Sequence, residues 1–98
     1  MPVAIVMDFP GATLEQYDQV IEKMGFTKNG PGAPGGLTHW AAATDTGIRV
    51  VDTWETRQQF DDFSRDKIGP ISAEVGMAGP PEINYYEVHN TLTPGPKA

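Results

Sequence analysis

Residues 48–63, IRVVDTWETRQQFDDF, decide the fold, because they are typical of a β-strand that runs directly into an α-helix. In a pleated strand alternate side chains point to the same face. The residues expected on one face are Ile48, Val50, Asp52 and Trp54. An acid therefore shares a strand face with aliphatic neighbours, and a tryptophan follows it on that face.

The second half of this stretch predicts a helix over residues 56–67. Thr56 supplies a hydroxyl for the N-cap, and Gln59 stands where a capping box requires Glu or Gln. Phe60 and Phe63 follow at helical spacing. We expect a kink at residues 68–70, Ile-Gly-Pro, and then a short helical segment that ends at residues 79–81.

Upstream, residues 3–9 predict a strand that is apolar on both faces except at Asp8. Residues 13–24 predict an amphipathic helix, capped by Thr13 with Gln16 and ended by Gly25. Residues 26–36 are too rich in glycine and proline for regular structure, and they form either a surface connection or a moving lid.

Residues 37–44 predict a strand. A turn in which Gly47 takes a positive φ joins it to the strand that begins at residue 48. Residues 83–92 predict the last strand, and residues 93–98 a flexible tail. On this last strand one face is expected to carry Ile83, Tyr85, Glu87, His89 and Thr91, and the other Asn84, Tyr86, Val88, Asn90 and Leu92.

The order of elements is βαββαβ, which predicts one α+β domain over residues 1–98 with a ferredoxin-like, four-stranded antiparallel sheet. Both helices must cover the same face of that sheet. Because the strands are apolar or aromatic on both faces, the second face also needs a cover. In a chain this short we expect a second copy to supply it, which gives a homodimer.

Composition excludes several classes of partner. The net charge is −6 and the basic residues are scattered, so nucleic-acid binding is not expected. No apolar run is long enough to cross a bilayer, and the N-terminal stretch does not have the pattern of a signal peptide. The chain has no cysteine, which suits a cytoplasmic protein, and no metal, flavin, nicotinamide or nucleotide motif, so we expect any activity to need no cofactor.

Residues 50–63, VVDTWETRQQFDDF, resemble the strand–Trp–helix segment of the dimeric α+β barrel superfamily, which includes antibiotic-biosynthesis monooxygenase-like and stress-responsive A/B barrel proteins. The resemblance implies a dimeric barrel that binds an apolar, aromatic or polyketide-like small molecule between sheet and helices. It is also compatible with cofactor-independent oxygenation, cyclisation or isomerisation, and with no catalysis. Fold does not decide among these activities.

The candidate catalytic residues are His39, His89 and Asp52, which could accept a proton from an acidic phenol or enol. Asp52 has a structural alternative, an ion pair or hydrogen bond across the sheet to His39 or Arg49. The candidate substrate-binding residues are Trp54, Tyr85, Tyr86, Glu87 and Asn90. Each of the histidines and aromatic residues also has a purely structural role open to it.

Three functions therefore remain open. The first is a small enzyme that abstracts a proton, the second a ligand-binding protein without chemistry, and the third a structural dimer whose barrel is filled by its own side chains. A cavity in the cleft between the two sheets of the dimer would exclude the third.

Overall fold

The computed structural model describes residues 1–92 and 94–96 and has the predicted βαββαβ order. The elements are β1 (Val3–Pro10), α1 (Leu14–Lys23), β2 (Gly36–Ala43), β3 (Gly47–Trp54), α2 (Arg57–Phe63), the π-helix η1 (Ser64–Ile68), α3 (Gly69–Glu74) and β4 (Glu82–Glu87). The α+β, ferredoxin-like fold class is confirmed. The predicted flexible tail falls partly on residues 93, 97 and 98, which lie outside the described residues.

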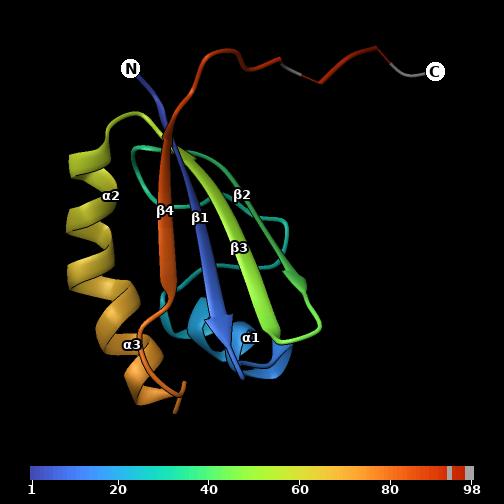
Figure 1. Ribbon diagram of the computed structural model, residues 1–98, viewed down its shortest axis with the longest axis vertical. Coiled ribbons are helices and arrows are strands. Elements are labelled where there is room, and N and C mark those ends of the chain that lie inside the picture. The colour runs from blue at the N-terminus through green and yellow to red at the C-terminus, as the bar shows by residue number, and fades with distance from the viewer. Residues whose placement is uncertain (93, 97–98) are drawn as a thin grey trace.

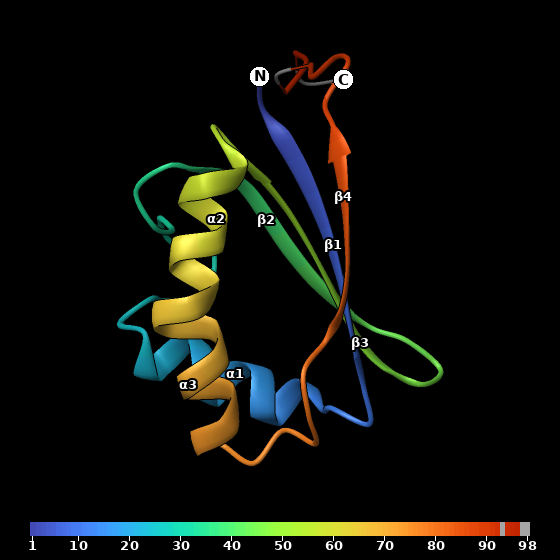
Figure 2. The ribbon, with the colours of Figure 1, turned by 60° about the vertical axis from the view of Figure 1, so that its left-hand side comes forward.

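The four strands form one sheet in the order β2-β3-β1-β4, and all neighbouring strands are antiparallel. Figures 1 and 2 show α1, α2 and α3 on one side of this sheet, and no helix formed by the described residues lies on the other side. The pairing of β2 with β3 is interrupted by a bulge between Gly36 and Thr38. The sheet therefore has a helix-covered face and an outer face.

The core lies between the sheet and the helices. Ile5 and Phe60 are fully buried there, and Trp54 is 4% exposed. Ile48, Val50, Asp52 and Trp54 all point to this side and are all buried, as the period-two pattern predicts. Burying these aliphatic and aromatic side chains supplies the main stabilisation, about 1.5–3 kcal/mol for each large side chain.

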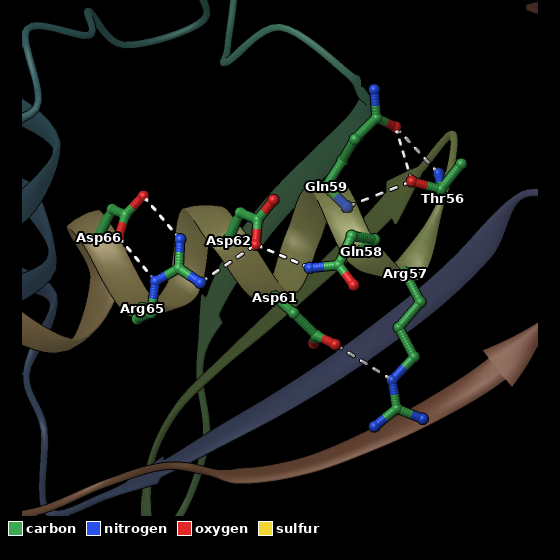
Figure 3. A network of polar contacts seen from close by, with 8 residues as sticks. All are labelled: Thr56, Arg57, Gln58, Gln59, Asp61, Asp62, Arg65 and Asp66. Carbon is green, nitrogen blue, oxygen red and sulfur yellow. Dashed lines mark hydrogen bonds and ion pairs between the residues drawn. The ribbon is translucent and has the colours of Figure 1, made fainter.

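Both predicted capping boxes are present. Thr13 and Gln16 exchange hydrogen bonds at the start of α1, and Thr56 and Gln59 do so at the start of α2 (Figure 3). Each box satisfies amide groups that a helix N-terminus leaves without an intrahelical partner. The caps thus determine where both helices begin.

The expected kink at residues 68–70 takes the form of a π-helical turn, η1, between α2 and α3. The Gly69 amide donates to the Ser64 carbonyl, five residues earlier, and Pro70, the second residue of α3, has no amide proton to donate. The helical path therefore continues through the proline instead of breaking.

Three details of the sequence-based prediction are wrong. The short helical segment ends at Glu74 and not at residues 79–81, because the chain turns at Gly76, which has a φ of 85°. The last strand ends at Glu87 and not at Leu92, because Glu87 pairs with Val3, where β1 begins, and no neighbouring strand extends further. Gly47 does not have a positive φ. It is required for another reason: a Cβ at this position would lie 2.1 Å from the backbone oxygen of Phe9.

The outer face of the sheet carries large side chains that remain accessible. Trp40 is 52% exposed and Tyr86 57% exposed, and Val6 and Val51 are half-buried between β2 and β4. Arg49 forms a two-pronged ion pair with Asp8 on the same face, and this guanidinium lowers the pKa of the Asp8 carboxyl. None of the helices in the described part of the chain has the length and apolar character needed to span a membrane.

Candidate functional site

A cavity of about 970 Å³ lies between the helix-covered face of the sheet, α1 and the loop that precedes β2. Its size is in the range of small-molecule sites. The strands contribute an apolar wall that includes Met7, Phe9, Ile48 and Val50, and Tyr17, His39 and Trp54 also line it. A smaller cavity of about 420 Å³ adjoins it, since both are lined by Trp54, Phe63 and Met24. The sequence pattern left open which sheet face lines a pocket, and these cavities lie at the helix-covered face.

His39 and Asp52 meet on this wall. They are register partners on β2 and β3, and His39 Nδ1 lies 2.6 Å from Asp52 Oδ1. The Asp52 side chain is 6% exposed, whereas the His39 side chain is 42% exposed. The buried acid thus has the cross-sheet partner that one interpretation of the sequence predicts, and that partner is His39. Arg49 bonds to Asp8 instead.

Trp54 completes the surroundings of the carboxylate. Its indole Nε1–H donates to Asp52 Oδ2 at 3.1 Å, so both carboxylate oxygens of Asp52 accept a hydrogen bond. A buried carboxylate is tolerated when its oxygens are satisfied in this way. Trp54 also packs against Phe60 and Phe63, with ring centroids 5.9 Å and 5.2 Å apart. The indole therefore holds Asp52 in place and also forms part of the cavity wall.

Tyr17 on α1 forms the next link of the same chain. Its Oη lies 2.5 Å from His39 Nε2, and the two rings are nearly parallel, 13° apart, with centroids separated by 5.9 Å. Burial, together with the negative charges of Asp52 and Asp18, raises the pKa of Tyr17 to about 12. The Tyr17 hydroxyl is accordingly a neutral group that can donate a hydrogen bond at neutral pH.

These contacts determine where the histidine carries its proton. Ionised Asp52 can only accept, so Nδ1 of His39 is the N–H donor and Nε2 holds the free lone pair. That lone pair accepts from the Tyr17 hydroxyl. The hydrogen bonds form one directed chain from Tyr17 through His39 to Asp52, in which His39 is the basic member.

Tyr17 was not among the residues that sequence reasoning selected. It occupies the apolar stripe of the helix 13–24, where position alone indicates packing. The available signal was chemical: a tyrosine in an apolar stripe needs a partner for its hydroxyl, and Asp52 and His39 were already candidate residues.

The other candidate residues lie outside both cavities. Tyr85 joins β4 to α2, because its hydroxyl donates to Asp61 at 3.1 Å and Arg57 lies 3.7 Å above its ring. Figure 3 shows Arg57 and Asp61 extending from α2 toward the sheet. Tyr86 is on the outer face, and the remaining three, Glu87, His89 and Asn90, are exposed at the end of β4 or beyond it.

A metal centre has no ligand set in the part of the chain that the structure describes. No group of three or more His, Cys, Asp or Glu side chains there is arranged to hold an ion. Three groups that line the cavity are joined by hydrogen bonds: the phenol of Tyr17, the imidazole of His39 and the carboxylate of Asp52.

The sequence matches no protein-family model and no curated protein. In structure the chain is similar to a conserved protein from Methanosarcina mazei Go1, with a TM-score of 0.61 and 14% identity, over 88% of this chain and 91% of that one. It is also similar to a monooxygenase from the gene ActVA-Orf6 of Streptomyces coelicolor, solved with the ligand nanaomycin D, with a TM-score of 0.49 and 22% identity, over 96% of this chain and 92% of that one. At these identities the likeness concerns the fold alone. The likeness to the first of these structures supports the α+β fold, and membership of the dimeric α+β barrel superfamily stays a prediction.

Proposed function

We propose that the protein binds a flat apolar or aromatic molecule in the larger cavity and removes a proton from an acidic hydroxyl of that molecule. His39 is the base, and Asp52 orients it and stabilises the imidazolium that forms. The observation that carries this proposal is the hydrogen-bonded pair of His39 and Asp52 on the wall of a cavity of about 970 Å³.

The charges around the cavity favour a neutral ligand. Besides Tyr17 and His39, its ionisable lining residues are three acids, Asp18, Glu22 and Asp52, against a single lysine, Lys28. A carboxylate on the ligand would meet like charges, whereas a phenol or an enol enters uncharged and becomes an anion only beside the base. The proposed substrate is therefore a hydroxylated arene or an enolisable polyketide-like molecule.

The anion formed in this way has two fates. It can pass an electron to O₂, which is the first step of a cofactor-independent oxygenation, or it can attack internally or be reprotonated elsewhere, as in a cyclase or isomerase. Both fates share the proton abstraction. Oxygen uptake distinguishes them.

The test is turnover of naphthols and hydroxylated anthracenes, followed by oxygen uptake and by product analysis. We expect His39→Gln and Asp52→Asn to abolish turnover while binding persists. His89→Gln is the matched control, because His89 is exposed beyond β4, and it should leave turnover unchanged. Binding without turnover in the unmodified protein would favour a carrier, and an absence of binding to every arene would contradict both functions.

We also propose that two copies pair through their outer sheet faces. The exposed rings of Trp40 and Tyr86, with Val6 and Val51 between them, form an apolar surface that such pairing would bury. Sedimentation velocity tests this. Trp40→Glu should convert a dimer into a folded monomer, and Leu92→Glu, at a residue that is 83% exposed outside the sheet, should not. A monomeric unmodified protein would refute the pairing.

A further inference from the structure

Tyr17 stands between the base and a ligand. Of the two nitrogens of His39, Nδ1 bonds to Asp52, and Nε2 lies 2.5 Å from the Tyr17 hydroxyl. An imidazole nitrogen has a single lone pair, so a substrate hydroxyl cannot bond to Nε2 unless Tyr17 moves away. The Tyr17 oxygen has a lone pair left for a substrate hydroxyl, whereas the Asp52 carboxylate is buried behind His39 and Trp54.

We propose that Tyr17 is the catalytic residue that contacts the substrate hydroxyl and that the proton reaches His39 through it. This inference rests on the proposed function and names the residue through which that function acts. As the substrate O–H bond breaks, the Tyr17 oxygen takes that proton and gives its own proton to His39 Nε2.

The step balances in atoms and charge. Before it the substrate, Tyr17 and His39 are neutral and Asp52 is a carboxylate. After it the substrate is an anion, Tyr17 is again a neutral phenol with a new proton, and His39 is an imidazolium paired with Asp52. The step transfers protons and no electron, and it needs no co-reactant.

The surroundings of Tyr17 favour this concerted shift over a free tyrosinate. Burial and the charges of Asp52 and Asp18 keep its pKa at about 12, so a full negative charge on its oxygen is disfavoured. In the concerted shift the phenol never holds that charge. After the shift its hydroxyl points to the substrate oxygen and donates to the developing anion, which is the arrangement that stabilises such charges.

Tyr17 is held in position from its own helix. The Gln16 side chain accepts a hydrogen bond from the Thr13 amide in the capping box and donates one to the Gly76 carbonyl at 3.3 Å, which attaches the first turn of α1 to the turn that follows α3. The phenol is therefore presented to the cavity by a capped helix and not by a mobile loop.

The test uses a phenol whose ionisation is visible, 4-nitro-1-naphthol, titrated from pH 5 to 10 with excess protein. The titratable groups that face the probe are Tyr17, Asp18, Glu22, Lys28, His39 and Asp52. In the unmodified protein the apparent pKa of the bound probe should fall below that of the free probe. Tyr17→Phe should weaken the preference for the phenolate at least tenfold, while affinity for the neutral probe changes less than threefold. Tyr86→Phe, on the outer face, is the matched control and should leave both unchanged.

The outcomes separate the two proposals. If His39→Gln removes the shift and Tyr17→Phe keeps it, the relay through Tyr17 is refuted and the proposed function stands. If the unmodified protein does not ionise the probe, the proposed function fails, and the relay fails with it.

A second measurement does not depend on the folding of a variant. In the unmodified protein we expect nuclear Overhauser effects between the bound probe and the ring protons of Tyr17. Effects to the ring proton of His39 without any to Tyr17 would overturn the inference.

Discussion

Replacing Asp52 by asparagine should reverse the direction of the hydrogen-bond chain while leaving the fold intact. The asparagine has one acceptor oxygen where the carboxylate has two. Trp54 Nε1–H is buried and has no partner other than Asp52 among the described contacts, so the asparagine oxygen should accept its hydrogen bond. The asparagine amide then donates to His39 Nδ1. His39 must carry its proton on Nε2 and donate to Tyr17, and it is no longer a base toward the cavity.

The cost in stability follows from the same two contacts, at 2.6 Å and 3.1 Å. Turning a charge-assisted hydrogen bond into a neutral one loses about 1 kcal/mol, so the two together lose about 2 kcal/mol. Removing a buried charge recovers part of the loss. We expect the free energy of unfolding to fall by about 1–2 kcal/mol, as urea denaturation would measure it.

The control is Asp45→Asn, the same chemical change at an exposed residue in the turn before β3. It should change stability by less than about 0.5 kcal/mol. The tautomer itself can be followed by ¹⁵N NMR of the imidazole, in which the protonated nitrogen should change from Nδ1 to Nε2. An unchanged tautomer in Asp52→Asn, or a stability equal to that of Asp45→Asn, would refute the directed chain.

Three further predictions follow from burial, close contact and ionisation. Phe60→Ala should lower the free energy of unfolding by about 3–5 kcal/mol, because Phe60 is fully buried, whereas Leu92→Ala at an exposed residue should have little effect; equal losses in denaturation would contradict the proposed core. Gly47→Ala should destabilise the protein by more than about 1 kcal/mol, since its Cβ would overlap the backbone of β1, and Gly32→Ala, which meets nothing within 4 Å, should be nearly neutral; similar melting temperatures would refute this. The pKa of Tyr17 is raised to about 12 in the folded state, so its contribution to stability is present below pH 10 and is lost between about pH 10 and 12. The unmodified protein should therefore lose stability across that range more steeply than Tyr17→Phe. Parallel curves of stability against pH for the two proteins would show that the raised pKa is absent.

Local signals account for most of what the sequence predicts correctly. The capping boxes at Thr13 and Thr56 involve neighbours three residues apart, so the starts of both helices can be read directly. The face of β3 follows from alternation alone. The end of β4 could not be predicted in this way, because it depends on where β1 begins, some eighty residues earlier.

The site was predictable in part. Asp52 was conspicuous because an acid on an aliphatic face needs a partner, and His39 was one of two partners considered. The strand pairing selects His39. Tyr17 was not selected from the sequence, because the apolar stripe of a helix has the same residue spacing whether it packs against a core or borders a cavity. His89 was selected because the last strand was predicted to extend to Leu92. The strand ends at Glu87, so the alternation of faces that placed His89 does not apply to it.

The bulge in β2 determines which residue lies opposite Trp54 and therefore how much of the cavity beside its indole stays open. Regular pairing would set Leu37 opposite Trp54, but one extra residue puts Gly36 there, and Leu37 is 51% exposed. A Cβ on Gly36 would lie 3.8 Å from the indole ring, in ordinary van der Waals contact, so a side chain at this position would border Trp54 directly. Deletion of one residue here would restore regular pairing and place Leu37 opposite Trp54, where its side chain would narrow the cavity beside the indole. One inserted residue in β2 therefore determines whether a glycine or a leucine borders Trp54 at the cavity wall.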